Sequence, residues 1–329
     1  MLISGLINNP ATSYFGELYK QLLRLKAPIF GIDRHRMMSD GEGVTTLVGF
    51  YGCPLSCQKC LNPQCKDEKF GKKNITPSDL YQIVKVDDLY FQATWGGVTF
   101  GGGEPLCYPA FITAFHELCK NNGWNLRMET SLNVRREVIK KVLPCINEFI
   151  VDIKDMNPDI YKAYTGVDNK PVKDNLRMLI EEGAADKILL RVPSIEGFNT
   201  DEDVLKSKRE LQEMGLQRFD CFSYETPSAL VDKKTIYGKN ICRVLKEIRK
   251  VAAEVNDIEY EPSECHFEGD CPGTCPKCDE ELKMLTEQLQ IRKTNGTFRE
   301  IPRQDLLFVG SKIHIDTPPT LVGDIIPNF

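Results

Sequence analysis

Short apolar runs alternate with amphipathic segments along most of the chain. The runs are short and largely apolar, which is typical of strands buried on both faces. The predicted strands are VTTLVGFYG (44–52), GVTF (97–100), LRMETS (126–131), FIVDIK (149–154), KILLRVPS (187–194) and RFDCFSY (218–224). A segment with helical periodicity follows each strand, at residues 78–86, 109–123, 134–143, 173–183, 201–215 and 238–255.

This alternation predicts an α/β fold with a parallel sheet and right-handed crossovers. Eight strand–helix units would close a full TIM barrel. The chain offers about six, so we expect a partial (β/α)6 TIM-like barrel with parallel strands and one open side. A doubly wound sheet is the alternative topology, and both place the chemistry at the carboxyl ends of the strands.

The alternation of predicted strands and helices covers only the middle of the chain and so divides it into three regions. Residues 1–39 begin with a helical pattern, TSYFGELYKQLLRLK, and are expected to form an N-terminal helical extension. Residues 40–257 carry the strand–helix units of the barrel. Residues 258–329 are expected to form a Cys-rich, metal-binding extension with a short helix at 279–291 and a proline-containing tail.

The composition and charge of the chain exclude several classes of protein. The chain has 329 residues, 27% of them charged, and a net charge of −5 without runs of like charge, so we expect no nucleic-acid partner. Apolar stretches fall short of the ~18 residues of a membrane span, and the N-terminus lacks the pattern of a signal peptide. We therefore expect a cytoplasmic protein whose thirteen cysteines are reduced, with clustered cysteines binding metal.

Polar residues follow every predicted strand at its carboxyl end. Because these ends meet at one rim of a parallel barrel, we expect a convergent site there, although a single polar strand end is common in any α/β protein. In strand order the clusters are Cys53, Cys57 and Cys60; Gly101, Gly102, Gly103 and Glu104; Glu129, Thr130 and Ser131; Asp152 and Lys154; Arg191 and Pro193; Tyr224 and Glu225.

The cysteine loop GCPLSCQKCLNP supplies three thiols where a closed metal site needs four. Cys53, Cys57 and Cys60 have the spacing C-x3-C-x2-C. Three thiolates can hold a [4Fe–4S] cluster and leave one iron open to an outside ligand. The alternatives are a zinc loop that borrows a fourth ligand such as Cys65, or three unrelated cysteines.

The cysteine loop, together with the GGE that follows the second strand, resembles the radical S-adenosylmethionine (radical SAM) superfamily. Within it, the chain resembles the activating enzymes of glycyl-radical enzymes, such as pyruvate formate-lyase activating enzyme. The matching stretches are DGEGVTTLVGFYGCPLSCQKCLNP (40–63), GGVTFGGGEPL (96–106), VDIKDMNPDIYKAYTGVDN (151–169) and LRVPSIEGFNTDED (190–203).

The resemblance implies binding roles for individual residues and leaves the catalytic residues unknown. It makes Cys53, Cys57 and Cys60 ligands of the [4Fe–4S] cluster, whose open iron would chelate S-adenosylmethionine (SAM). The residues expected to bind SAM are Gly102, Gly103 and Glu104 at its amino group, Glu129 and Thr130 near the ribose, and Asp152, Lys154 and Arg191 at the ribose and carboxylate. Taken singly, Glu129 could be a helix cap and Asp152–Lys154 a structural pair.

A second cysteine motif, CHFEGDCPGTCPKC, lies in the C-terminal region. Its members Cys265, Cys271, Cys275 and Cys278 give four thiols, so a closed site is expected, either an auxiliary [4Fe–4S] cluster, which the spacing favours, or structural zinc. His266 is the one plausible histidine ligand. The isolated cysteines are predicted to be small core residues: Cys107, Cys119, Cys145, Cys221 and Cys242.

These observations lead to three functional hypotheses. The first is a radical SAM activase that cleaves SAM to a 5′-deoxyadenosyl radical and takes hydrogen from a glycine of a partner glycyl-radical enzyme, with flavodoxin or ferredoxin as electron donor. The second is a radical SAM enzyme that modifies a peptide or small molecule with help from an auxiliary cluster. The third is a non-catalytic zinc or iron–sulfur protein, which would not cleave SAM.

Overall fold

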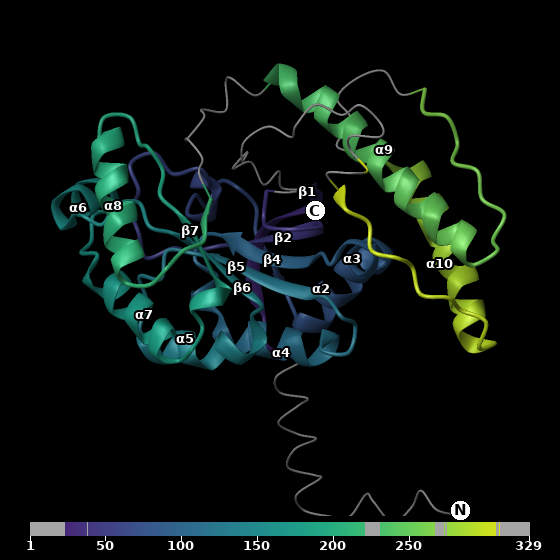
Figure 1. Cartoon of the computed structure of the whole chain (residues 1–329), viewed down its shortest axis with the longest axis horizontal. Helices are drawn as coiled ribbons and strands as arrows, with labels where there is room; N and C mark the ends of the chain where they lie inside the picture. Colours follow the sequence, from purple (N-terminus) through teal and green to yellow (C-terminus); the bar gives the residue numbers. More distant parts are fainter. Residues whose placement is uncertain are drawn as a thin grey trace, which may run out of the picture.

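The computed structural model describes residues 24–37, 39–220, 231–266, 273, 275–306 and 309. Figure 1 shows a central sheet with helices packed along its outer side and a pair of helices, α9 and α10, at one end. Most of the predicted helix at residues 12–26 lies outside the described residues. Four further residues of the sequence analysis also lie outside them: Cys221, Tyr224, Glu225 and Cys271.

The described strands form one sheet in the order β3-β1-β2-β4-β5-β6-β7-β8. From β2 onward, neighbouring strands are parallel, whereas β1 pairs antiparallel with both β2 and β3. The strands are β1 Ala27–Met37, β2 Val44–Phe50, β3 Lys73–Ile75, β4 Gly97–Gly102, β5 Asn125–Thr130, β6 Glu148–Asp152, β7 Ile188–Arg191 and β8 Phe219–Asp220.

Helices connect successive parallel strands. The described helices are α2 Pro77–Val84, α3 Asp88–Thr94, α4 Pro109–Cys119, α5 Arg136–Val142, α6 Pro158–Thr165, α7 Lys170–Glu181, α8 Asp201–Glu213, α9 Val231–Val255 and α10 Pro276–Thr294. Capping boxes fix two of the helix starts, because Thr76 and Asp79 exchange side-chain and backbone hydrogen bonds at α2, as Thr200 and Asp203 do at α8.

The partial-barrel prediction is confirmed. The six parallel strands lie side by side in the order in which they occur in the chain, so the sheet winds in one direction. A doubly wound sheet would instead reverse its strand order at a switch point. The predicted strand–helix units are all present in the described residues, with β8 described only as Phe219–Asp220.

The strand β1 corrects the prediction for the start of the chain. Residues 1–39 were expected to be a helical extension, but Ala27–Met37 forms a long strand that covers the edge of β2. The four residues Asp33–Arg36 are all polar, His35 has a positive φ of 61°, and the pairing with β2 shifts register between Asp33 and Arg36. Because of the polar run and the irregular pairing, the alternation that is typical of a strand is absent there, and β1 was not predicted.

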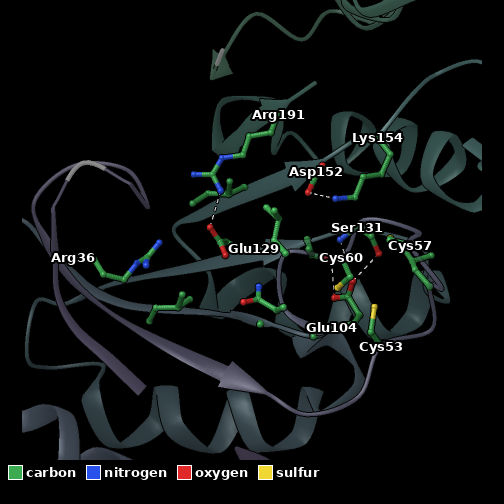
Figure 2. Close-up of a pocket in the computed structure, with 18 residues that line it drawn as sticks. Arg36, Cys53, Cys57, Cys60, Glu104, Glu129, Ser131, Asp152, Lys154 and Arg191 are labelled. Atoms are coloured by element: carbon green, nitrogen blue, oxygen red, sulfur yellow. Dashed lines mark hydrogen bonds and ion pairs between the residues drawn. The ribbon is translucent and has the colours of Figure 1, made fainter. Parts of the chain in front are cut away.

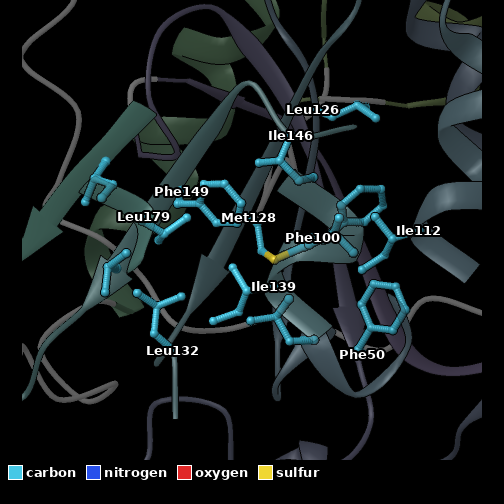
Figure 3. Packing of buried hydrophobic residues seen from close by; sticks show 14 of the residues in the cluster. Phe50, Phe100, Ile112, Leu126, Met128, Leu132, Ile139, Ile146, Phe149 and Leu179 are labelled. Carbon is cyan, nitrogen blue, oxygen red and sulfur yellow. The ribbon is translucent and has the colours of Figure 1, made fainter. Parts of the chain in front are cut away.

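The main hydrophobic core lies between the sheet and the helices on its outer side (Figure 3). Phe50, Phe100, Met128 and Phe149 come from consecutive parallel strands. They pack against apolar side chains of the covering helices, including Ile112, Ile139 and Leu179. This burial holds the strand ends in fixed register and therefore positions the loops that follow them.

A second core attaches α9 and α10 to the barrel. It joins Tyr90 of α3 and Val44 of β2 to Ile248 of α9 and Leu285 of α10. Arg249, almost fully buried, ties these parts together by donating to Tyr90 Oη and to Glu281 of α10. Within the described residues, no helix is long and apolar enough to cross a membrane.

Candidate functional site

An open cavity of about 130 Å³ lies at the carboxyl ends of the parallel strands. Figure 2 shows the side chains that line it, which come mainly from the loop after β2 and from the ends of β4, β5, β6 and β7, with further side chains from β1 and β2. All of the residues predicted for the cluster and for SAM line this one cavity: Cys53, Cys57, Cys60, Gly102, Gly103, Glu104, Glu129, Thr130, Asp152, Lys154 and Arg191.

The cysteine loop is held in place mainly by its backbone. The amides of Ser56 and Gln58 donate to the carbonyls of Thr165 and Tyr164 at the end of α6, at 2.8 and 3.0 Å. The hydroxyl of Tyr164 donates back to the carbonyl of Lys59. Because these contacts use main-chain groups, the thiols of the loop remain directed at the cavity, and α6 serves as its support.

Cys65, the alternative fourth ligand, is buried behind the loop and does not line the cavity. Its thiol hydrogen-bonds to Cys60 and lowers the pKa of Cys60 to about 6. Burial, followed by the charge of Glu104, raises the pKa of Cys53 to about 12. The three cysteines of the loop therefore differ in their environments, and Cys60 is the one that ionises most easily.

The glycine segment after β4 lies directly against the cysteine loop. Gly103 and Glu104 donate their amides to the carbonyls of Phe50 and Gly52, at 2.9 and 2.8 Å. A Cβ on Gly103 would lie 2.2 Å from the carbonyl oxygen of Gly52, so only glycine allows this approach. Gly102 has a φ of 87°, a left-handed conformation that also favours glycine.

Glu104 is buried, and its carboxylate organises the neighbouring strand end. It accepts hydrogen bonds from the hydroxyl of Thr130 at 2.7 Å and from the amide and hydroxyl of Ser131 at 3.0 and 2.8 Å. Burial raises the pKa of Glu104, and these donors oppose that shift. Both carboxylate oxygens therefore accept hydrogen bonds, and the side chain holds the end of β5 against the turn that follows β4.

Arg191 lies at the end of β7 and joins three parts of the rim. It donates to Glu129 of β5 at 2.6 Å, to Asp220 of β8 at 2.9 Å and to the carbonyl of Ser39. Burial disfavours its charge, but the carboxylates of Glu129 and Asp220 raise its pKa. The guanidinium is therefore fully charged and fixed in orientation on the cavity wall.

Asp152 and Lys154 form an ion pair at the end of β6. Lys154 has a positive φ of 60°, which is unusual for a residue with a side chain, and its ammonium lies 6.0 Å from the ring centre of Tyr164. Strained backbone of this kind is concentrated at functional sites. It directs the ammonium over the cysteine loop (Figure 2).

Several cavity residues were not predicted from the sequence. Arg36 of β1 lines the cavity and donates to Asp40 at 2.7 and 2.8 Å, but its strand was not predicted. Leu61 and Asn62, which follow the last cysteine of the loop, also line the cavity and were not predicted to do so. Ser131 lines it too, and was predicted only as a polar residue at the end of a strand. Apolar side chains complete the lining: Leu47, Leu55 and Ile150.

The second cysteine motif is only partly gathered. The sulfurs of Cys275 and Cys278 lie 3.6 Å apart, whereas Cys265 and His266 are exposed. Among the isolated cysteines, Cys119 and Cys242 are buried as predicted, and Cys145 is half-buried. Cys107 was wrongly predicted as a core residue, since it is exposed at the turn after Glu104.

Within the described ranges, no group of three or more Cys, His, Asp or Glu side chains is gathered closely enough to enclose one metal ion. The three thiols of the cysteine loop line the cavity beside Gly102 and Gly103, and three thiols are the donor set that holds a [4Fe–4S] cluster with one open iron.

A one-directional partial barrel with a three-cysteine loop at its open rim defines an iron–sulfur enzyme of the TIM-like class. The chain belongs to the radical SAM superfamily, whose profile matches residues 47–211. It is a radical SAM enzyme, and membership implies a [4Fe–4S] cluster and SAM as its cofactors.

The chain is similar to curated proteins that are named as activating enzymes of a lyase and of a dehydratase. The chain is 27% identical to choline trimethylamine-lyase activating enzyme of Oleidesulfovibrio alaskensis, over 56% of this chain and 77% of that protein. It is 29% identical to (2S)-3-sulfopropanediol dehydratase activating enzyme of Klebsiella oxytoca, over 57% and 78%. A solved domain of pyruvate-formate lyase-activating enzyme from Bacteroides vulgatus covers 39% of this chain and 99% of that chain, with 21% identity and a TM-score of 0.30, too low to add to the argument.

Proposed function

We propose that this protein activates a glycyl-radical enzyme: it cleaves SAM reductively to methionine and a 5′-deoxyadenosyl radical, which takes a hydrogen atom from a glycine of the partner. The observation that carries the proposal is the single cavity at the strand ends, which gathers all three cysteines of the loop and every residue predicted to bind SAM. Relatives named as activating enzymes support the choice of partner class.

The cluster, when bound to Cys53, Cys57 and Cys60, supplies the electron that cleaves SAM. The chain itself binds and orients the substrate. Gly102 and Gly103 line the cavity, and the close packing of Gly103 against the cysteine loop brings this backbone next to the cysteines, where the amino end of SAM would bind. Glu129, Asp152, Lys154 and Arg191 offer charged groups of both signs for its hydroxyl, amino and carboxylate groups.

The partner's glycine must reach the cavity, so an open rim suits a protein substrate better than a closed barrel. In the described residues, β3 and β8 are the unpaired edges of the sheet, and the barrel is not closed. We propose a flavodoxin or ferredoxin as the electron donor and the cytoplasm as the compartment, because exposed iron–sulfur sites and reduced thiols require reducing conditions.

A second candidate is a radical SAM enzyme that modifies a peptide or small molecule with help from an auxiliary metal site. The pair Cys275–Cys278 favours it, because it indicates a further metal site formed with Cys265 and Cys271, as an iron–sulfur cluster or zinc. Such a site would be required for the reaction under this candidate, whereas an activase needs it only for structure.

The reaction is tested on the anaerobically reconstituted protein with SAM and dithionite, by assay of 5′-deoxyadenosine. We expect product from the wild-type protein and a loss of at least 100-fold in Cys57→Ala. The matched control is Cys119→Ala, a buried cysteine of α4 away from the cavity, which should keep its iron and its activity. Full iron loading without product would contradict both enzymatic candidates.

The partner class is tested by adding purified glycyl-radical enzymes of the classes whose activating enzymes are similar to this chain. An activase produces a glycyl-radical EPR doublet on one of them and a stoichiometric amount of 5′-deoxyadenosine. SAM cleavage without a glycyl radical on any of them, together with turnover of a peptide or small molecule, would favour the second candidate.

A further inference from the structure

A second cavity, called here the lower cavity, lies at the amino ends of the parallel strands, opposite the cavity that the cysteine loop lines. It is open and has a volume of about 880 Å³. Small-molecule sites in proteins typically measure about 300–1,000 Å³. Its lining comes from the first residues of β5, β6, β7 and β8 and from residues 41–43 and 303–306. The cavity is therefore large enough for a small ligand.

Two arginines on one wall of the lower cavity share a single carboxylate. Arg127 of β5 forms an ion pair with Oε2 of Glu148, the first residue of β6, at 3.2 Å. Arg218, just before β8, donates to the other oxygen of the same carboxylate. All three side chains line the cavity. This wall therefore carries one net positive charge.

Arg127 has fewer partners than its burial requires. Its side chain is 6% exposed, and its Nη2 reaches the carbonyl of Trp95 only at 3.4 Å. Within the described part of the chain, its Nη1 has no hydrogen-bond partner. Buried donors in proteins are nearly always paired, so an unpaired guanidinium nitrogen beside a cavity indicates a missing acceptor.

Two other buried arginines of the barrel show what full compensation looks like. Arg36 donates to the carboxylates of Asp33 and Asp40, and Arg191 donates to two carboxylates as well. Burial lowers the pKa of Arg127, and the nearby carboxylates, Glu148 foremost, offset this only in part. Burial acts in the same direction on the other two, but their carboxylates outweigh it and raise the pKa. Arg127 therefore lacks negative charge that its counterparts have.

The rest of the lining limits the kind of anion that fits. Glu42 pairs with Arg303. Asp220 pairs with Arg191, and Asp305 is a third carboxylate of the lining. These carboxylates would repel a second negative charge on a ligand, so a singly charged anion fits better than a phosphate. Apolar side chains complete the lining: Leu189, Phe219 and Leu306.

The walls of the lower cavity are held in place by specific contacts. The guanidinium of Arg303 lies 3.9 Å from the ring centre of Trp95, and the amide of Gln304 donates to the carbonyl of Ala93 at 2.7 Å. On the other side, Gly41 has a φ of 91°, and a Cβ there would lie 2.8 Å from Nε of Arg127. Glycine thus allows the loop to pack directly on the arginine, and the cavity is preformed.

We propose that the lower cavity binds a small monocarboxylate with an apolar body, whose carboxylate accepts hydrogen bonds from Arg127 and Arg218. Guanidinium groups bind carboxylates strongly because two N–H donors match the two oxygens. The apolar body would then lie against Leu189, Phe219 and Leu306. Binding is non-covalent and transfers no electrons. The site goes beyond the proposed activase reaction and does not depend on it.

Equilibrium dialysis of radiolabelled benzoate against the anaerobically reconstituted, full-length protein tests the proposal. SAM is present in excess, so that the cavity beside the cysteine loop is filled. We expect saturable binding of about one benzoate per chain, at least tenfold weaker in Arg127→Gln and at least threefold weaker in Arg218→Gln. Arg177→Gln, an exposed arginine of α7, is the matched control and should bind benzoate as the wild type does.

The competitors and variants give outcomes that would overturn the proposal. Benzyl alcohol has the same ring without the carboxylate, and displacement by it as strong as by unlabelled benzoate would show a merely apolar cavity. Equal displacement by inorganic phosphate would refute the preference for a monocarboxylate. Benzoate binding that disappears when SAM is added would belong to the other cavity.

Binding that is absent, or equal in all three variants, would also refute the site. Thermal unfolding shows whether Arg127→Gln is folded. If it is not, Arg218→Gln decides, because that side chain is 46% exposed and its replacement leaves the core intact.

Discussion

The guanidinium of Arg191 donates to the carboxylate of Glu129 across 2.6 Å and so joins the end of β7 to the end of β5, passing over β6 (Figure 2). The arginine side chain is 6% exposed and the glutamate 21%, so the pair is largely shielded from water. A shielded pair of this kind holds both side chains in one orientation. The cavity wall is thus preorganised before SAM enters.

Arg191→Lys should weaken SAM binding because lysine cannot reach Glu129, Asp220 and the Ser39 carbonyl at once. We expect at least a tenfold higher Kd for SAM with iron content unchanged, measured by equilibrium binding to the reconstituted protein. Arg177→Lys, an exposed arginine paired with Asp174 on α7, is the control and should bind normally. Equal Kd values for the two variants would contradict this role.

Glu104→Gln should destabilise the rim between β4 and β5. The amide would present an NH2 group to Ser131, whose amide and hydroxyl both donate to the carboxylate. One buried donor left unsatisfied costs about 1–3 kcal/mol, and we expect a loss of that size in urea unfolding. Glu117→Gln, a half-exposed residue of α4, should change stability by less than about 0.5 kcal/mol. A stability of Glu104→Gln equal to that of this control would refute the argument.

The sequence was most informative where each strand ends. The carboxyl ends of parallel strands must meet, so Gly102, Thr130, Asp152 and Arg191 could be placed on one rim from pattern alone. Arg36 could not be found in this way, because it reaches the cavity from an antiparallel strand that is not part of the repeating unit.

The contact between Cys242 and Cys278 could not be predicted from the sequence for a different reason. Thirty-six positions separate the two residues, and only the packing of α9 on α10 brings the two sulfurs together. Spacing rules relate only residues that are close in the chain, so they cannot find a neighbour of this kind. The role of each residue toward SAM stays a prediction.

Asp87 should make the protein sensitive to acid. This buried carboxylate accepts hydrogen bonds from Arg34 and His35. Burial alone would raise its pKa, but the charges and hydrogen bonds of His35 and Arg34 hold the pKa well below its usual range. Its folded pKa is thus below the unfolded value of about 3.9, so its stabilisation is present above that pH and is lost as the pH falls further.

The measurement is urea unfolding between about pH 5 and pH 2 for the wild type and for Asp87→Asn. One carboxylate contributes a slope of at most about 1.4 kcal/mol per pH unit, which the wild type should show in addition to the slope of the variant. Parallel curves for the two proteins would exclude Asp87 as a source of acid sensitivity. The comparison cancels the other carboxylates, which both proteins share.

Gly103→Ala should separate the glycine segment from the cysteine loop. Its Cβ would meet the carbonyl oxygens of Gly52 and Phe50 at 2.2 and 2.7 Å, and backbone cannot yield as a side-chain end can. We expect a destabilisation of about 3 kcal/mol and weaker SAM binding, measured by thermal unfolding and equilibrium binding. Gly71→Ala, where nothing lies within 4 Å of the added Cβ, is the control and should behave as the wild type.

Lys154 allows the backbone strain and the ammonium group to be tested separately. At its φ of 60°, a residue with a Cβ is destabilised by about 1–2 kcal/mol, whereas glycine is not. Lys154→Gly and Lys154→Ala both remove the ammonium that pairs with Asp152. They differ in strain, so the glycine variant should be more stable than the alanine variant by about 1 kcal/mol in urea unfolding.

Both variants should nevertheless lose SAM cleavage by at least tenfold, because neither supplies a cation above the cysteine loop. Stability and activity would then respond to different properties of the same residue, as expected where strain is retained for function. Equal stability of the two variants would show that the backbone at position 154 is relaxed. Normal 5′-deoxyadenosine formation by the glycine variant would instead show that the ammonium has no part in binding SAM.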